Sequence, residues 1–344
     1  MNQSQHAGTP SVPTSRASDM VQRRARLFQV RERLPKPELA LASLSYLSLR
    51  YLNDVAVGEV GGRLPYAADS GSNCLFYSVH EDPAALFHCP FLYQAQYESV
   101  QKFLAVPFDQ LGEMDRDAPS GPTFVFSIGR CGSTLLVRML VAAGLTAISE
   151  PDIFSQMARP EAQKFAPRDR RQCLAAAARC FAAHSHREVV IKLRSACNTI
   201  APLIMGSTPA SRCEFILRNR RDWARSMFAV GPFEATMLAK QLAVALMALD
   251  RLIALGHCSG PVWYEDIVRE PKEILRRFPT SVAAQEDAEL ARAISQDSQS
   301  GTILSREHVA RRAVSDDVLN RFEEEWRKIR PQAIMTKLGL TARL

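Results

Sequence analysis

A glycine-rich turn near the middle of the chain has the residue types that bind a phosphate or sulfate group. It follows the apolar run 124–128, opens directly into a helical pattern, and consists of Gly129, Arg130, Cys131, Gly132, Ser133 and Thr134. A turn of this kind directs several backbone N–H groups to one place, where the helix macrodipole also favours negative charge. Arg130 adds a fixed positive charge, and the two hydroxyl residues add donors. The turn therefore predicts an anion cradle and a nucleotide-like ligand.

The turn differs from the common ATP-binding loop, which has four residues between two glycines, then Lys, then Ser or Thr. Here only two residues separate Gly129 from Gly132, and the cationic residue, Arg130, lies inside the turn. The Lys that holds the β- and γ-phosphates is missing, and no carboxylate follows as a magnesium ligand. We therefore expect no metal. An ordinary strand–turn–helix with a glycine elbow is the alternative at this point.

A second group of polar residues follows the apolar segment 213–217. Arg218 stands directly after this segment, and Ser226 comes eight residues later, past an expected helix start at Arg221 or Asp222. An arginine binds phosphate with a planar fork of donors, and a serine hydroxyl donates once. The pair can hold a second phosphate group, although a solvated basic helix start explains the same residues without a ligand.

Strands and helices that position these residues alternate from residue 121 onward. Short apolar runs predict strands at 124–128, 188–193, 213–217 and 262–264. Helical spacing predicts helices at 135–143, 168–183, 221–230, 235–256 and 315–338. This alternation predicts an α/β fold of the P-loop type, with three layers and a mostly parallel central sheet flanked by helices. Ligands of such sheets bind beyond the carboxyl ends of the strands, where the glycine turn falls.

An N-terminal extension precedes this domain, which we expect over residues 119–344. Residues 1–18 are rich in Ser, Thr, Pro, Gln and Gly, and they predict a disordered tail. We expect residues 19–118 to form a helical or irregular accessory region. A basic helix is expected within 19–34 and a packed helix over 39–52. The region either caps the core domain or faces the substrate.

Amino-acid composition and net charge limit the ligands and the cellular compartment to be expected. The 344-residue chain is 47% hydrophobic and 23% charged, and it carries a formal net charge of +7. This charge suits an acidic ligand without requiring nucleic acid, because the arginines are spread over several segments. The eight cysteines form neither a C-x-x-C pair nor a zinc spacing, which favours free thiols in a reducing compartment. Without a signal core or a run of about 20 apolar residues, we expect a cytoplasmic protein that contacts no membrane.

The two polar groups together resemble the sulfotransferase family, which transfers a sulfuryl group from 3′-phosphoadenosine 5′-phosphosulfate (PAPS). The glycine turn resembles the family's phosphosulfate-binding loop, and Arg218 with Ser226 resembles its 3′-phosphate site. The stretch VWYEDIVREP at 262–271 is similar to a strand and turn of the family, and ISEP at 148–151 is similar to a segment of its bacterial and carbohydrate members. The resemblance covers roughly residues 120–305 and implies metal-independent transfer to a hydroxyl or amine.

The resemblance implies roles for the residues near the reacting end. Arg130 would stabilise charge on the bridging oxygen as the sulfuryl group leaves, and Lys192 matches a lysine near the transferring group. The remaining residues of the turn would hold the 5′-phosphate, and Arg218 with Ser226 would hold the 3′-phosphate. The family's C-terminal donor loop has a weaker counterpart at Ser300, Gly301 and Arg306.

The general base is where the chain departs from the family pattern. Cytosolic members have a His two residues after the lysine, but here the position is Arg194, which cannot accept a proton. Glu150 is the candidate base, because a Glu near this point has that role in several non-cytosolic branches. A structural carboxylate that orients Arg130 or caps the next turn explains Glu150 equally well. We expect Glu265 and Asp266 to tie a strand end to a helix start or an arginine.

Two other functions remain as alternatives. A P-loop kinase for a small molecule would use Mg-ATP, and a non-enzymatic protein would bind nucleotides or nucleic acid through its basic residues. For a sulfotransferase, the acceptor is left open among a small molecule, a carbohydrate and a peptide. The aromatic residues at 86–96 line an acceptor pocket or belong to the core. The oligomeric state is not indicated.

Overall fold

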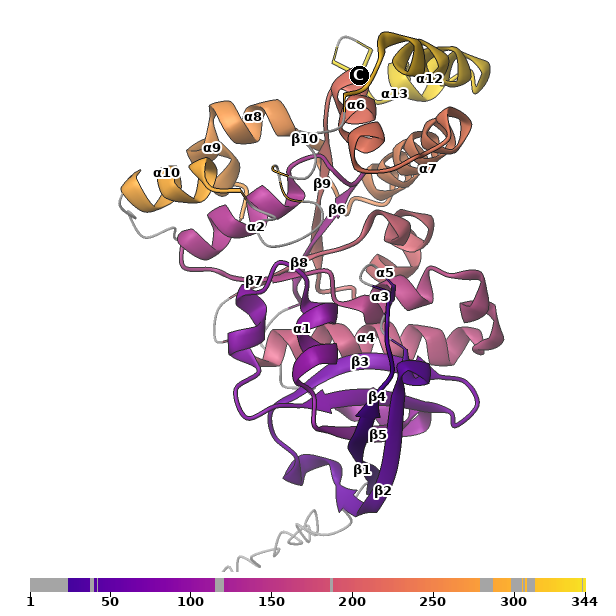
Figure 1. The fold of residues 1–344 in the computed structure, drawn as a ribbon, viewed down its shortest axis with the longest axis vertical. Helices are drawn as coiled ribbons and strands as arrows, with labels where there is room; N and C mark the ends of the chain where they lie inside the picture. Colours follow the sequence, from indigo (N-terminus) through magenta and orange to yellow (C-terminus); the bar gives the residue numbers. More distant parts are fainter. Residues whose placement is uncertain are drawn as a thin grey trace, which may run out of the picture.

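The computed structural model describes residues 24–37, 40, 41, 43–114, 121–185, 188–278, 287–297, 305, 307, 313–341, 343 and 344. These residues form two five-stranded sheets that share a hydrophobic core (Figure 1). Within them, no helix is both long enough and apolar enough to cross a bilayer. All eight cysteines are free.

The N-terminal sheet is antiparallel, with the strand order β2-β1-β5-β4-β3. Its strands are β1 (Arg24–Arg33), β2 (Leu47–Ala56), β3 (Arg63–Asp69), β4 (Cys74–Val79) and β5 (Lys102–Pro107). The connections contain α1 (Leu92–Ser99) and the short helices η1 (Leu44–Tyr46), η2 (Val57–Glu59), η3 (Ala84–His88) and η4 (Phe108–Glu113).

The helices predicted within 19–34 and over 39–52 are wrong, because residues 24–33 form β1 and residues 47–52 belong to β2. The two strands pair with each other along almost their whole length, and β1 also pairs with β5. Leu47 and Leu49 follow the strand period of two, a signal that the general leucine content of the segment concealed. Pairing with distant strands outweighs the local preference for helix.

One face of this antiparallel sheet packs on the rest of the protein. Side chains of β3, β4 and β5 join the same core cluster as Leu174 and Phe181 of α4 (Pro167–Ala183), which crosses the sheet in Figure 1. The Ala68 N–H donates to Gln156 Oε1 at 3.1 Å, and Arg179 of α4 donates to the carbonyl oxygens of two η4-region residues at 2.8 Å. The antiparallel sheet is therefore joined firmly to the elements that follow it in the chain.

The second sheet is parallel and has the order β10-β9-β6-β8-β7. Its strands are β6 (Thr123–Ser127), β7 (Thr146–Ser149), β8 (Val189–Lys192), β9 (Arg212–Leu217) and β10 (Pro261–Trp263). Four of them were predicted, whereas β7, only four residues long, was not. Its short apolar run lacks the length that separates a strand from the end of a preceding helix.

Helices cover both sides of the parallel sheet, which confirms the predicted α/β class. Figure 1 shows α2 (Ser133–Ala142), α8 (Tyr264–Arg269), α9 (Pro271–Leu275) and α10 (Asp287–Ser295) on one side. The other side carries α5 (Ala201–Ser207), α6 (Arg220–Val230), α7 (Ala235–Ala254), α12 (Asp316–Lys328) and α13 (Gln332–Lys337). The described residues also form α3 (Asp152–Met157), η5 (Pro160–Lys164) and η6 (Ser195–Ile200).

The helix predicted over 315–338 is divided into α12 and α13. Arg330, between them, has a φ of 56°, and Pro331 follows it. A left-handed residue ends a helix, and proline has no N–H to continue the hydrogen-bond ladder. The amphipathic spacing of residues persists across the break, which is why the sequence pattern did not reveal it.

Candidate functional site

The carboxyl ends of all five parallel strands meet at one cavity of about 420 Å³. Ser127 ends β6 and Lys192 ends β8, while Glu150, Arg218 and Tyr264 directly follow β7, β9 and β10. All five residues line the cavity. Because each stands at the end of a strand, the pairing of the sheet fixes their spacing, and the cavity lies where parallel α/β sheets bind ligands.

The glycine turn forms one wall of this cavity and has an unusual backbone. Gly129, Arg130 and Gly132 have φ values of 73°, 49° and 82°, all in the left-handed region. Alternation of such residues with ordinary ones points successive N–H groups into a concave anion site. Gly132 is also the N-cap of α2 and offers no side chain to the helix. The first N–H groups of α2 are therefore left for a ligand.

Side chains from distant elements hold the backbone at the start of the turn in place. Trp223 of α6, fully buried, donates through Nε1 to the Gly129 carbonyl at 2.9 Å. Asn198 Nδ2 donates to the Ser127 carbonyl at 2.9 Å, and Gln241 Nε2 donates to the Ile128 carbonyl at 3.3 Å. Because these carbonyls are paired with other side chains, the backbone shape of the turn is held by contacts that do not use its N–H groups.

Cys131 packs beneath the turn instead of facing the cavity. Its side chain is fully buried, and Sγ lies 3.6 Å from the Ile216 carbonyl oxygen. Burial raises the pKa of this thiol. Its predicted contact with a ligand can therefore involve only its backbone.

Gly132 cannot carry a side chain without distorting the site. A Cβ atom there would lie 2.3 Å from Tyr264 Cδ2, and the left-handed φ adds about 1–2 kcal/mol for any other residue. We expect Gly132→Ala to lower the free energy of unfolding by at least that amount, measured by urea denaturation. Gly206→Ala is the control, because nothing described lies within 4 Å of that position in α5 and alanine favours a helix. Equal stabilities of the two variants would contradict the tight approach of Tyr264.

Arg218, Arg130 and Ser226 lie together at one end of the cavity. Arg218 donates to the Arg130 carbonyl at 3.3 Å, and Arg130 Nε donates to Ser226 Oγ at 3.3 Å. The Arg218 guanidinium stacks over the Tyr264 ring at 4.4 Å, and its Nε is buried with no hydrogen-bond partner among the described residues. Arg130, predicted to act at the bridging oxygen, thus lies beside the predicted phosphate pair.

The two guanidinium groups repel each other in a poorly solvated place. Burial lowers the pKa of Arg130, and the charge of Arg218 lowers it further. Like charges held close together at a partly buried site are relieved by an anion. The positive charge at this end of the cavity favours an anionic ligand, and the assignment of Arg218 and Ser226 to a phosphate group stays a prediction.

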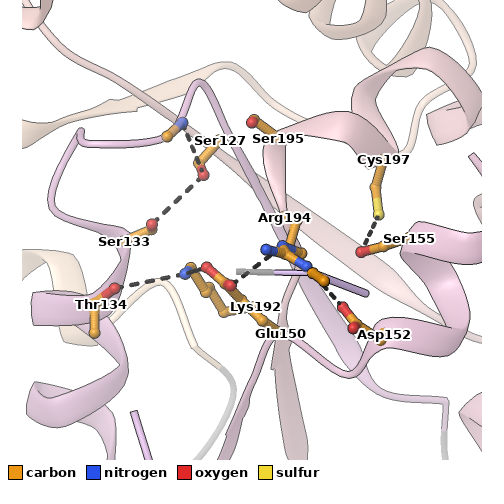
Figure 2. A network of polar contacts seen from close by, with 12 residues as sticks. Ser127, Ser133, Thr134, Glu150, Asp152, Ser155, Lys192, Arg194, Ser195 and Cys197 are labelled. Atoms are coloured by element: carbon orange, nitrogen blue, oxygen red, sulfur yellow. Dashed lines mark hydrogen bonds and ion pairs between the residues drawn. The ribbon is translucent and has the colours of Figure 1, made fainter. Parts of the chain in front are cut away.

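Lys192 and Glu150 form an ion pair at the other end of the cavity (Figure 2). Lys192 Nζ also donates to Thr134 Oγ1 at 3.5 Å, which connects the pair to the first turn of α2. The side chains of Lys192 and Glu150 are only 5% and 13% exposed. The structure thus brings together the predicted base, the predicted lysine and the glycine turn, three segments far apart in sequence.

Arg194 holds Glu150 from the opposite side. Its Nε lies 3.5 Å from Glu150 Oε2, and its Nη1 lies 3.0 Å from Asp152 Oδ1. Its guanidinium carbon lies over the Tyr93 ring, 4.7 Å from the ring centroid. Burial acts to lower the pKa of Arg194, but Asp152 and then Glu150 outweigh it, so this pKa lies above its ordinary value. Arg194 therefore stays charged and orients the carboxylate. Sequence patterns gave no sign of its contact with Asp152.

Glu150 has a strained backbone. Its φ is 55°, and its N–H donates to the Lys192 carbonyl at 2.8 Å. In the described part of the chain, the non-glycine residues with positive φ are Asn73, Arg130, Glu150 and Arg330. Residues other than glycine adopt this conformation at a cost, and such strain is concentrated at functional sites. Two of these four positions are predicted catalytic residues.

The YED segment has the structural role that was predicted for its acidic residues. Glu265 Oε1 accepts from the Asn219 N–H at 3.1 Å, at the start of α6, and Asp266 pairs with Arg343 and Arg269. Tyr264, for which no role was predicted, lines the cavity instead. Its stacking on Arg218 depends on the side-by-side pairing of β9 and β10.

The predicted donor-loop residues Ser300, Gly301 and Arg306 lie outside the described residues. The described Asp297 lines the cavity. Over the described ranges, no group of three or more His, Cys, Asp or Glu side chains has the arrangement of a metal site.

Comparisons with known proteins do not assign a function to the chain. No family profile matches the chain, and no curated protein matches its sequence. Among solved structures, the chain is similar to retinol dehydratase in complex with androsterone and the inactive cofactor PAP, with a TM-score of 0.25 and 10% sequence identity. The alignment covers 78% of this chain and 76% of the other.

Proposed function

We propose that this protein is a sulfotransferase that transfers a sulfuryl group from PAPS to a hydroxyl or amine group. One observation carries the proposal. The glycine turn, the Arg218 and Ser226 side chains and the Lys192–Glu150 pair all line one cavity. We assign the turn to one phosphate group and Arg218 with Ser226 to another. A donor with phosphate groups at both the 5′ and the 3′ position would use both assignments, whereas ADP or ATP would use only the first.

Residues of the cavity supply the contacts that such a donor needs. The N–H groups of the turn and the hydroxyls of Ser133 and Thr134 would hold the 5′-phosphate. Arg218 and Ser226 would hold the 3′-phosphate, which would give the buried Nε of Arg218 its missing partner. When bound, PAPS supplies the sulfuryl group for transfer.

Lys192 and Glu150 would divide the chemistry at the reacting end. Lys192 neutralises negative charge that builds up beside Thr134, as a preorganised cation in a poorly solvated site does. Glu150 accepts the proton of the attacking hydroxyl or amine. A negatively charged ligand competes with Glu150 for Lys192, and Arg194 then keeps the carboxylate in place.

A calorimetric titration tests the proposal directly. We expect 3′-phosphoadenosine 5′-phosphate to bind without magnesium with a Kd of about 1 μM or lower, equivalent to about −8 kcal/mol. ADP should bind far more weakly, because it leaves Arg218 without a phosphate. Equal or absent binding would exclude the sulfotransferase. A kinase would instead prefer Mg-ATP, and a nucleic-acid binder would ignore the 3′-phosphate and lose affinity steeply with salt.

Arg218→Ala should weaken the binding of 3′-phosphoadenosine 5′-phosphate by about 10- to 100-fold, because a hydrogen bond to a charged group contributes about 1.5–3 kcal/mol. The affinity for ADP should not change, and calorimetry measures both. Arg225→Ala is the matched control, because Arg225 also lies on this part of the chain but is exposed and pairs with Asp222. An unchanged affinity in Arg218→Ala would show that the 3′-phosphate site is misassigned.

A further inference from the structure

Helix α1 of the N-terminal region reaches the candidate site. Phe91, the N-cap of this helix, lines the cavity at the strand ends. The nearby Tyr93 is fully buried, and its ring lies under the guanidinium of Arg194. Figure 1 shows α1 between the two sheets. The N-terminal region, for which the alternatives were a cap or a contact with substrate, thus touches a residue of the site.

Asp152, Glu150 and Tyr93 all contact the Arg194 guanidinium. Figure 2 shows this group between the two carboxylates, and the Asp152 side chain that accepts from its Nη1 is only 1% exposed. The face of the Tyr93 ring supplies the third contact. A guanidinium is planar, and its attraction to an aromatic face is strongest where water is excluded. The three contacts together fix both the position and the plane of the group.

The Tyr93 ring is itself held by the N-terminal region. Lys36 Nζ lies over this ring and over the ring of Tyr97, 5.2 and 5.4 Å from the two centroids. The Tyr97 hydroxyl donates to the Leu34 carbonyl, and the Tyr97 carbonyl accepts from Arg33 Nε at 2.9 Å. Because Arg33 ends β1, these contacts connect Tyr93 to the antiparallel sheet. The orientation of the arginine at the site therefore depends on elements outside the parallel sheet.

We propose that Tyr93 is a positioning residue for the transfer, which acts through Arg194 on Glu150. This inference rests on the proposed function. An anionic donor competes with Glu150 for Lys192, and Arg194 then holds the carboxylate. Without the Tyr93 ring, the guanidinium can turn out of its plane, and the carboxylate turns with it. A general base works only when its oxygen is directed at the proton that it removes.

The chemical step itself does not involve Tyr93. The acceptor proton passes to Glu150 as the acceptor oxygen bonds to sulfur. The bond from sulfur to the 5′-phosphate oxygen breaks, and 3′-phosphoadenosine 5′-phosphate is released. Because Tyr93 does not line the cavity, its loss should slow the reaction of the bound donor and leave the affinity for the donor unchanged.

Sulfate release from labelled PAPS in a single turnover tests this role with water as the acceptor. Water carries the same O–H group as an alcohol, so Glu150 removes its proton in the same way. Methionine fills irregular space but has no aromatic face, and we expect Tyr93→Met to lower the rate by at least about tenfold, or about 1.4 kcal/mol. The affinity for 3′-phosphoadenosine 5′-phosphate, measured by calorimetry, should not change. Tyr93→Phe keeps the aromatic face and should release sulfate at the wild-type rate.

Tyr77→Met is the matched control for the loss of a buried ring. Tyr77 is also fully buried in the N-terminal region, but its hydroxyl contacts Met114 and it does not line the cavity. This variant should release sulfate at the wild-type rate. Equal rates for Tyr93→Met and the wild type would overturn the role of Tyr93, whether or not either exceeds the uncatalysed rate. An equal loss in Tyr77→Met or in Tyr93→Phe would also overturn it, because packing or the hydroxyl would then explain the effect.

Arg194→Lys tests the same link without removing the ring, and it decides the question if Tyr93→Met does not fold. Lysine keeps the positive charge beside the two carboxylates but has no planar group to lie on the ring. We expect the same loss of rate, and normal sulfate release would overturn the proposal. The double variant Tyr93→Met, Arg194→Lys should be no slower than Arg194→Lys, because both changes break one contact. Losses that multiply would show that Tyr93 acts independently of Arg194.

Failure of the proposed function would look different from failure of this inference. A wild-type protein that does not bind 3′-phosphoadenosine 5′-phosphate would remove the donor site and the role of Tyr93 together. Normal donor binding with an unchanged rate in Tyr93→Met would overturn only the positioning role.

Discussion

Glu150→Gln is expected to lower kcat by about 10²- to 10⁴-fold, the usual contribution of a positioned general base. The amide has nearly the same size as the carboxylate, but it cannot take a proton from the acceptor. Binding of 3′-phosphoadenosine 5′-phosphate should stay intact, because Arg218 and Ser226 lie at the other end of the cavity. Initial rates of sulfate transfer and calorimetry measure the two properties separately.

Glu161→Gln is the control for this prediction, because Glu161 is exposed on η5 and does not line the cavity of the candidate site. It makes the same chemical change and should have no effect. If Glu150→Gln keeps kcat within about tenfold of the wild type, or about 1.4 kcal/mol, Glu150 is not the base. Its contacts with Lys192 and Arg194 would then serve only to order the strand ends.

Lys192→Ala is expected to lower kcat by about 10²- to 10³-fold, equivalent to about 2.7–4 kcal/mol, the effect of removing one preorganised donor from a developing charge. The reason is the position of Lys192, which contacts both Thr134 at the glycine turn and Glu150. Lys337→Ala is the control, because Lys337 is exposed and pairs with Asp250 away from the site. A loss below about tenfold would remove Lys192 from the reaction.

Loss of stability has to be separated from loss of catalysis in this variant. Removing Lys192 leaves the Glu150 carboxylate, only 13% exposed, with Arg194 as its remaining partner. Removal of one member of a buried pair is more destabilising than removal of both. We therefore expect the double variant Lys192→Met, Glu150→Gln to be more stable than Lys192→Ala, yet equally inactive. If the double variant recovered activity, stability would explain the original loss.

Much of the structure after residue 121 could be predicted because its signals are local. Short apolar runs marked β6, β8, β9 and β10, and helical spacing marked α4, α6 and α7. The glycine turn and the Arg218–Ser226 spacing could also be recognised, since each lies within a few residues of one strand end. Placement of both at the same edge follows from the rule that parallel strands carry ligands at their carboxyl ends.

Pairing between distant segments could not be predicted in this way. The strands β1 and β2 depend on partners far along the chain, so their local composition was mistaken for helix. The break at Arg330 depends on one residue in a left-handed conformation, which the amphipathic pattern does not record.

The sequence by itself determined which side chains stand at the strand ends, because residue type and local periodicity are properties of short segments. Only the tertiary structure decided which of these side chains lie in contact with one another. The side-by-side order of β7 and β8 brings Glu150 to Lys192, and the approach of α6 to the turn brings Ser226 to Arg130. These contacts join residues that are remote in sequence, and their geometry is set by sheet order and helix packing.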